Sequence, residues 1–175
     1  MLRTISRPAA ILAAFFLCFL AAPSARADTT ASPDPDAVVQ DFAAPETFDA
    51  VLAKAQAGDA KAQCALGVAY INGTRAPQNF GQGLHWLHRS SEAGYGYARY
   101  VLADLYSRGY GGVPVSDAQA YYFASLAAAS SSLPEKFREK AVKLRNASAR
   151  RLSPAELTGL QAKAALAPLD AAAGN

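Results

Sequence analysis

This sequence lacks a large excess of basic over acidic residues. Its 175 residues include 17 basic and 14 acidic side chains, for a formal net charge of +3. Three of the basic residues, Arg3, Arg7 and Arg26, lie among the first 27, so the rest of the chain carries 14 basic and 14 acidic groups. Nucleic-acid binding relies on a surplus of Lys and Arg to displace counterions from phosphates. A chain with balanced charge is therefore not expected to bind nucleic acid.

Cysteines and β-branched residues are also scarce. Of the two cysteines, Cys18 lies in the N-terminal apolar stretch and Cys64 lies beyond it, so we expect no internal disulfide in the processed chain. Cys64 is expected to be a small buried apolar residue, with a reactive thiol or an intermolecular bridge as the alternative. From residue 28 onward there are 33 alanines but only nine valines and isoleucines. This composition predicts an all-α protein, because Ala favours helices and β-branched residues favour strands.

The first 27 residues have the parts of a secretory signal peptide. Arg3 and Arg7 precede 14 uncharged, mostly apolar residues from Ala9 to Ala22, and small residues surround a cleavage site after Ala27. Such a stretch rises about 21 Å as a helix, less than the roughly 30 Å hydrocarbon core of a bilayer, which argues against a membrane anchor. We therefore predict cleavage after Ala27 and a periplasmic or secreted protein.

One pattern occurs twice along the chain, 36 residues apart. An alanine, a leucine, a tyrosine and a glycine recur in register, as Ala62, Leu66, Tyr70 and Gly73 and then as Ala98, Leu102, Tyr106 and Gly109. The spacing of the first three puts them on one stripe of a helix, and the glycine suits a left-handed helix end. Asn79 or Ser116 then starts a second helix as its N-cap, and that helix carries Trp86 or Phe123. Each copy is predicted to be a pair of helices.

Partial copies flank the two full ones. Ala57-Gly58 leads into the first copy as Ala93-Gly94 leads into the second, so a helix like the second helix of a copy precedes the pair. The chain then divides into a signal peptide (1–27), a flexible linker (28–44), an N-terminal capping helix (45–58), a first repeat (59–94), a second repeat (95–131), C-terminal capping helices (132–167) and a disordered tail (168–175). The expected total is about seven helices.

Two further helices are expected from capping-box spacing near the C-terminus. Ser132 with Glu135, and Ser153 with Glu156, each match this signal. The apolar stripes of the two helices are predicted to contain Phe137, Ala141, Leu144, Leu152, Leu157, Leu160 and Leu166.

The repeated pattern, Ala-x-x-x-Leu-Gly-x-x-Tyr-x-x-Gly followed by Pro and an aromatic-centred helix, resembles the Sel-one-like repeat family, relatives of the tetratricopeptide repeats. The resemblance covers about residues 45–131, and Ala103 departs from it where the family has Gly. It implies an α–α superhelix, a solenoid of antiparallel helix pairs. It also implies a scaffold for protein–protein contacts, often in bacterial envelopes.

The residues between the repeated positions are the candidates for partner binding. By the resemblance, the first helix of each unit lines a concave surface. Because Tyr and Arg are enriched at interface hot spots, we predict a pocket there. Its residues are Tyr97, Tyr100, Asp104 and Arg108, with Lys61, Val68 and Ile71 from the first copy. The alternative is that the tyrosines only pack between units.

Signals for chemistry are weak. His85, His88 and Glu92 have the spacing of a zinc site, but no second cluster supplies a fourth ligand, so polar residues around Trp86 are the expected role. The glycine clusters at 81–83 and 109–112 follow helices and lack the Lys-Ser/Thr pair of a phosphate loop. Neither Ser-x-x-Lys nor Gly-x-Ser-x-Gly occurs after residue 27. We predict no enzyme and no cofactor.

A basic C-terminal stretch leaves a second function open. Residues 135–163 hold eight basic and three acidic groups, and the candidates for surface contact are Lys136, Lys140, Lys143, Arg150 and Arg151. They could rest on envelope polymers or an anionic membrane surface, or form a solvated outer face. Our main expectation is an exported, monomeric, non-catalytic adaptor that binds another envelope protein, with the polymer or membrane-surface binder as the alternative.

Overall fold

The computed structural model describes residues 47–168 and residue 170, and within these residues the regular structure is helical, with no strand. The elements are α2 (Phe48–Gln56), α3 (Ala60–Asn72), α4 (Phe80–Glu92), α5 (Gly96–Arg108), the short 3₁₀ helix η1 (Tyr110–Gly112), α6 (Asp117–Ala129), α7 (Glu135–Ala149) and α8 (Pro154–Ala165). The all-α prediction is confirmed. The expected signal peptide and linker lie outside the described residues.

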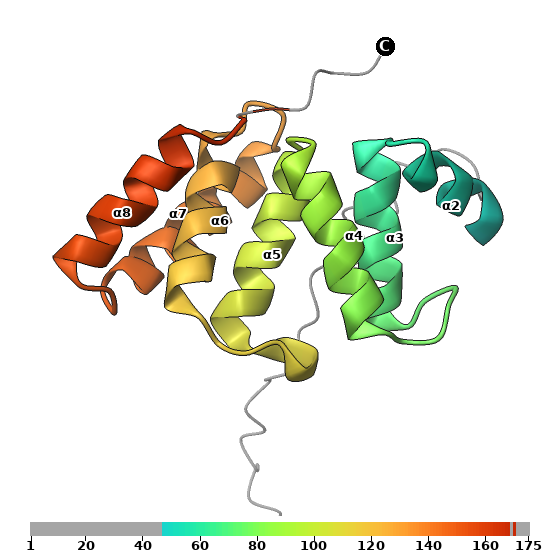
Figure 1. The fold of residues 1–175 in the computed structure, drawn as a ribbon, viewed down its shortest axis with the longest axis horizontal. Helices are drawn as coiled ribbons and strands as arrows, with labels where there is room; N and C mark the ends of the chain where they lie inside the picture. The colour runs from blue at the N-terminus through green and yellow to red at the C-terminus, as the bar shows by residue number, and fades with distance from the viewer. Residues whose placement is uncertain (1–46, 169, 171–175) are drawn as a thin grey trace, which may run out of the picture. The chain divides into compact units, whose positions relative to one another are not determined.

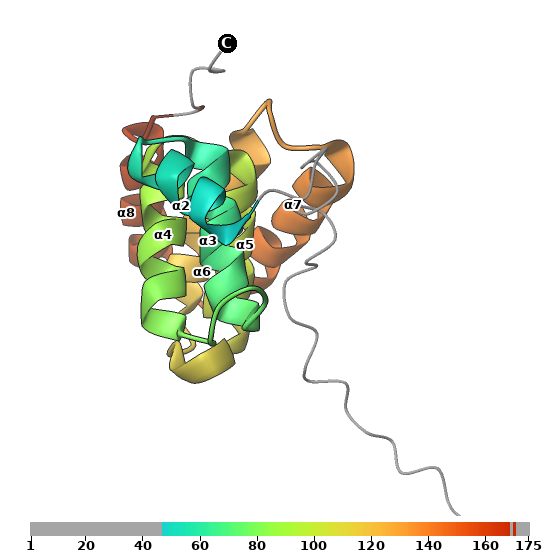
Figure 2. The same cartoon turned by 90° about the vertical axis from the view of Figure 1, so that its right-hand side faces the viewer.

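The helices pack against their neighbours in the chain as a solenoid (Figure 1). Helices α3 and α4 form one pair and α5 and α6 the next, while α4 packs on α5 and joins the pairs. Helix α2 covers α3 at one end, and α7 packs on both α5 and α6 at the other. Figure 2 shows α3, α5 and α7 on one side of the stack, which we call the first-helix face, and α4 and α8 on the opposite side.

Local sequence signals set the ends of the repeat helices as predicted. The Asn79 side chain accepts a hydrogen bond from the backbone N–H of Gln82 at 3.0 Å, which caps α4. Ser116 caps α6 in the same way. Gly73 and Gly109 end α3 and α5 with φ of 68° and 71°, the left-handed conformation that glycine adopts without steric cost.

The two capping boxes predicted near the C-terminus have different outcomes. Ser153 and Glu156 form the reciprocal box at the start of α8. The prediction for Ser132 is wrong, because α7 starts after Pro134 without a side-chain cap. A box at Ser132 would make Leu133 helical, and a residue that precedes proline is driven away from the helical region.

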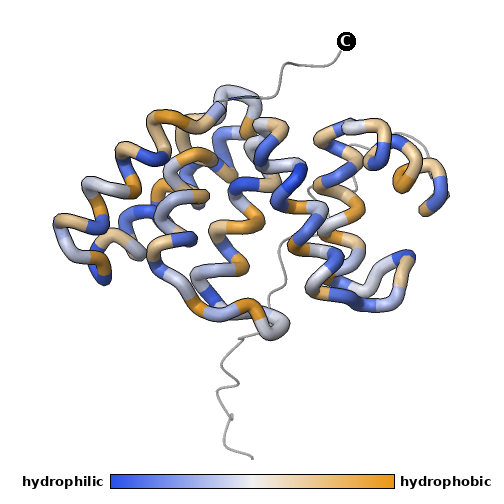
Figure 3. Tube along the Cα trace, viewed as in Figure 1, coloured by the Kyte–Doolittle hydropathy of each residue, from blue (hydrophilic) through white to orange (hydrophobic). Residues whose placement is uncertain are grey.

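The apolar residues that correspond between the two repeats are all buried in apolar clusters between the helices. Leu66 and Trp86 belong to a cluster under α2, α3 and α4, and Leu102 and Phe123 to a larger one under α5, α6 and α7. Each is at most 7% exposed. Figure 3 shows apolar and polar positions mixed along each helix, as expected when one stripe of every helix is covered.

The C-terminal segment departs from the expected pattern. Helix α8 packs on α6 and has no buried residue, and Leu166, predicted for its apolar stripe, is 88% exposed. In the predicted tail, the Asp170 carboxylate accepts hydrogen bonds from the hydroxyls of Ser130, at 2.5 Å, and Ser131, at 2.7 Å. The chain after α8 thus contacts the turn between α6 and α7. None of the described helices has the length and apolar character needed to cross a membrane.

Candidate functional site

Five of the seven side chains predicted to bind a partner are buried. Val68, Ile71, Tyr97, Tyr100 and Asp104 are all 7% exposed or less. Of the other two, Lys61 is half-buried and Arg108 is exposed. The expectation that all seven line an open surface is therefore wrong for Val68, Ile71 and Tyr97, whereas Tyr100, Asp104 and Arg108 line a groove between α5 and α7.

Helix α7 is the reason for the burial of the two tyrosines. Its Phe137 ring lies edge-on to Tyr97, with 5.0 Å between ring centroids, and 5.4 Å from Tyr100. All three rings belong to the larger buried cluster. Both tyrosines thus pack at the interface between the second repeat and the helix that follows it, and Tyr100 also lines a groove there.

The two aliphatic residues of the first repeat are buried by its neighbours. A Cβ added to Gly83 of α4 would lie 2.7 Å from the Ile71 side chain, so Ile71 packs against its own repeat partner. Val68 joins the cluster that contains Tyr97 and Val101 of α5. Packing of α4 and of the cluster shared with α5 therefore removes both from the surface.

Asp104 and Arg108 do lie together, as predicted. An Arg108 Nη2 atom is 2.9 Å from a carboxylate oxygen of Asp104, one helical turn earlier on α5. Burial raises the pKa of the Asp104 carboxyl, and the Arg108 guanidinium opposes this rise. The Arg108 side chain is 47% exposed, so the pair joins a buried acid to a cation at the surface.

A groove of about 370 Å³ opens between α5 and α7 on the first-helix face, beside this ion pair. We call it the α5–α7 groove, and its lining residues are Tyr100, Asp104, Arg108, Lys140, Lys143, Leu144 and Ala147. Lys140 and Lys143 are exposed at its rim, and neither forms an ion pair with a described carboxylate. Three cations thus surround one acid that is already paired.

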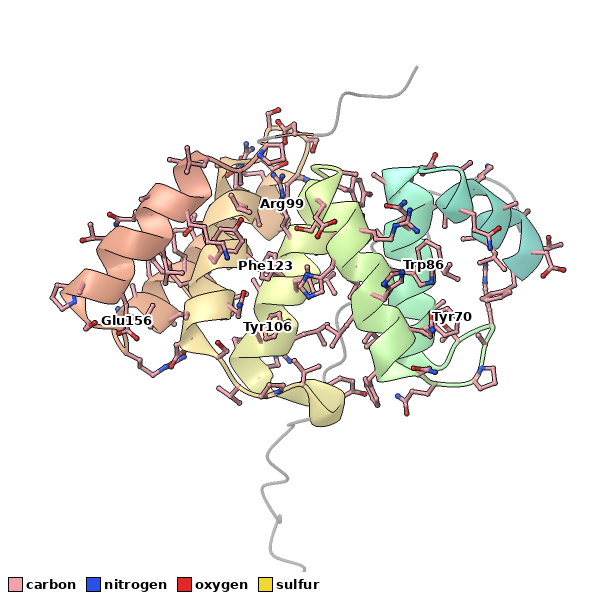
Figure 4. The ribbon with its side chains drawn as sticks, in the orientation of Figure 1. Tyr70, Trp86, Arg99, Tyr106, Phe123 and Glu156 are labelled. Carbon is pink, nitrogen blue, oxygen red and sulfur yellow. The ribbon has the colours of Figure 1, made fainter. Side chains whose placement is uncertain are left out.

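A second pocket, of about 320 Å³, lies between α4, α6 and the segment after α8. At its base is Arg99, labelled in Figure 4, which is fully buried. The Arg99 guanidinium donates hydrogen bonds to the carbonyl oxygens of Ser91, at 3.3 Å, and Pro168. These partners give Arg99 a structural role in holding the C-terminal segment.

The side chains considered for chemistry have packing roles in the structure. His88 Nε2 lies 3.2 Å from the Tyr106 hydroxyl, and the His88 ring is edge-on to Phe123, which stacks on Tyr106 (Figure 4). Burial lowers the pKa of His88, although Glu92 opposes this. No group of His, Cys, Asp and Glu side chains in the described part of the chain is arranged to hold a metal ion. Cys64 is fully buried with a free thiol, and burial raises its pKa.

Sequence reasoning missed how α7 contributes to this face. It placed Lys140 and Lys143 on a separate basic helix, whereas the structure puts them on the rim of the groove that contains Tyr100, Asp104 and Arg108. The available signal was Phe137, whose place in the apolar stripe indicates that α7 buries a large ring against some neighbour. Arg99 gave no signal, because a basic residue within a helix is ordinarily exposed.

Each repeat is a pair of packed helices, and the second pair stacks on the first. This arrangement makes the protein a helical-repeat solenoid. The family model of the Sel1 repeat matches residues 60–95 and 96–132, so the chain contains two Sel1 repeats. Sel1 repeats are generally scaffolds for protein–protein interaction and are typically non-catalytic.

The solved structures contain a protein with the same fold. The crystal structure of c5321, a protective antigen present in uropathogenic Escherichia coli strains and displaying an SLR fold, is similar with a TM-score of 0.60 and 22% sequence identity. The similarity covers 79% of this chain but only 29% of that one. No curated protein matches the sequence.

Proposed function

We propose that this protein is an exported, non-catalytic scaffold that binds another protein of the bacterial envelope through its first-helix face. The observation that carries the proposal is the α5–α7 groove, an opening between a repeat helix and the helix that follows the repeats, with exposed cations at its rim. Interfaces combine a desolvated apolar centre with a polar rim. The groove has both, with Tyr100 and Leu144 inside and Arg108, Lys140 and Lys143 around them.

Support for export comes from the sequence of residues 1–27, with its basic start, apolar stretch and small-residue cleavage site. Mass spectrometry of the protein from fractionated producing cells tests this part. We expect a periplasmic or secreted species whose first residue is Asp28. A full-length product confined to the cytoplasm would contradict export.

Protein binding is tested by cross-linking in intact producing cells, followed by purification of the protein and mass spectrometry. We expect the monomeric chain to be linked to one or a few proteins of the envelope, reproducibly and above the level seen with an unrelated exported protein. A chain that recovers only itself would contradict the proposal.

A second candidate function is binding to an anionic envelope polymer or membrane surface. The observation in its favour is the row of exposed lysines on α7, Lys136, Lys140 and Lys143. Retention on anionic vesicles that weakens with salt, and that is lost when all three lysines are replaced by Gln, would support it. Retention that survives this replacement would exclude it.

A further inference from the structure

We infer that the α5–α7 groove binds an acidic segment of the partner protein, with an apolar side chain of that segment in the groove and its carboxylates on Arg108, Lys140 and Lys143. The inference rests on the proposed protein-binding function and assigns the surface and the chemistry of the partner. The repeat pattern already predicts Tyr100, Asp104 and Arg108 at a binding pocket, and the structure adds Lys140 and Lys143 of α7.

The charge of the groove is the first argument. Asp104 is the one carboxylate among the seven lining residues, and its ion pair with Arg108 already offsets it. Lys140 also lowers the pKa of Asp104, so it adds positive potential over the buried acid. The rim therefore has a surplus of positive charge, which is complementary to carboxylates.

Part of the positive charge near the groove is neutralised within the chain. Arg138 pairs with Glu135 one turn away, and Arg151, just beyond the helix, pairs with Asp117 of α6. Two basic residues outside the groove thus have carboxylate partners within the chain, whereas Arg145 donates to the amide oxygen of Asn146. The lysines at the rim have none among the described residues.

The shape of the groove is the second argument, and it favours a peptide over a membrane. The opening of about 370 Å³ is lined by the buried or half-buried residues Tyr100, Leu144 and Ala147 as well as by the exposed cations. A side chain that projects from a peptide can reach such a recess, whereas a flat layer of lipid headgroups contacts only the rim. An acidic segment with a large apolar residue satisfies both the recess and the charges.

The test compares two double variants. Lys140→Glu/Lys143→Glu reverses two charges at the groove, and Arg89→Glu/Arg150→Glu makes the same charge change on exposed residues that do not line it, one on α4 and one after the end of α7. The probe is a fluorescein-labelled short peptide in which glutamates flank a leucine–phenylalanine pair, and its counterpart has glutamines. Binding is measured by fluorescence anisotropy with the protein as the cell produces it, after circular dichroism has shown unchanged helicity.

We expect the glutamate peptide to bind more tightly than the glutamine peptide, and the groove variant to weaken that binding about tenfold or more, because two attractive charges at the rim become repulsive. The control variant should stay within about threefold of the wild type at moderate salt, where distant charges are screened. Equal binding of the two peptides, or equal weakening by both variants, would overturn the inference. The inference would also be overturned if the protein bound phosphatidylglycerol vesicles but not the glutamate peptide. It would be overturned as well if the protein self-associated and the groove variant abolished that self-association.

Failure of this inference is distinct from failure of the proposed function. If the wild type is cross-linked to an envelope protein in cells and the groove variant is linked to it equally well, the chain is a scaffold that uses another surface. If the wild type is linked to no protein, the scaffold proposal itself fails.

Discussion

Gly67 of α3 and Gly83 of α4 face each other so closely that neither position has room for a methyl group. A Cβ added to Gly67 would lie 3.0 Å from the Gly83 carbonyl oxygen and 2.7 Å from Leu87, and one added to Gly83 would lie 3.0 Å from the Gly67 carbonyl oxygen. The backbones of the first repeat's two helices therefore meet at this pair. In the second repeat the matching residues are Ala103 and Ala120, both fully buried.

The first prediction is that Gly67→Ala destabilises the protein by about 1–3 kcal/mol, because the added methyl group forces the two helices apart. Urea denaturation followed by circular dichroism measures this. Gly81→Ala in α4 is the matched control, since its Cβ meets only Asn79 Oδ1 at 3.4 Å and alanine favours a helix by up to about 1 kcal/mol. Loss of stability in the control but not in Gly67→Ala would refute the close-contact explanation.

Features that depend on nearby residues could be predicted from the sequence. The N-caps at Asn79 and Ser116, the left-handed glycines after α3 and α5, and the capping box at Ser153 all involve residues within one turn of each other. The burial of Leu66 and Leu102 followed from helical spacing. Local geometry alone determines these features.

Features that depend on long-range packing could not be predicted. Whether Tyr97 and Tyr100 are open or covered depends on Phe137, from a helix outside the two repeats. The Arg99 contact with Pro168 joins residues 69 positions apart. No periodicity in either segment encodes such a contact, so the site residues on α5 were assigned to a surface that α7 partly covers.

The second prediction concerns Asp170 and pH. Hydrogen bonds from Ser130 and Ser131 hold the pKa of the Asp170 carboxyl below its usual range. A depressed pKa in the folded state means that these bonds stabilise the C-terminal segment above about pH 3.9, the unfolded value, and that the contribution is lost as the pH falls through the folded pKa. The Ser131 amide, which donates to this carboxylate at 3.2 Å, is expected to report the titration in NMR spectra.

The control for this titration is the variant Asp170→Asn. In this variant the chemical shift of the Ser131 amide should no longer change with pH in the acidic range. If the wild-type amide instead titrates at or above pH 3.9, the carboxylate does not gain the hydrogen bonds described.

The third prediction separates the real capping box from the apparent one. Ser153→Ala removes the cap of α8 and should destabilise that helix by about 1 kcal/mol, with faster hydrogen exchange in its first turn. Ser132→Ala should leave exchange at the start of α7 unchanged, because Ser132 caps no helix. Hydrogen exchange with mass spectrometry measures both variants, and equal effects at the two sites would contradict the assignment.

The fourth prediction concerns the Cys64 thiol. Because it is fully buried and burial raises its pKa, we expect iodoacetamide to leave it unmodified in the native protein at pH 8 and to modify it after denaturation in guanidinium chloride. Mass spectrometry measures the fraction of Cys64 that has been modified. Rapid labelling of the native protein would show that this part of the core opens readily.

Site-specific photo-cross-linking in producing cells tests most directly that the chain is a scaffold that binds a protein at the α5–α7 groove. A photoreactive residue replaces Ala147, a neutral, half-buried residue of the groove, and in a second strain Gly159, an exposed position on α8 with open space around it. The account predicts a discrete cross-linked envelope protein from position 147 and none from position 159. No product from position 147, or the same products from both positions, would contradict it.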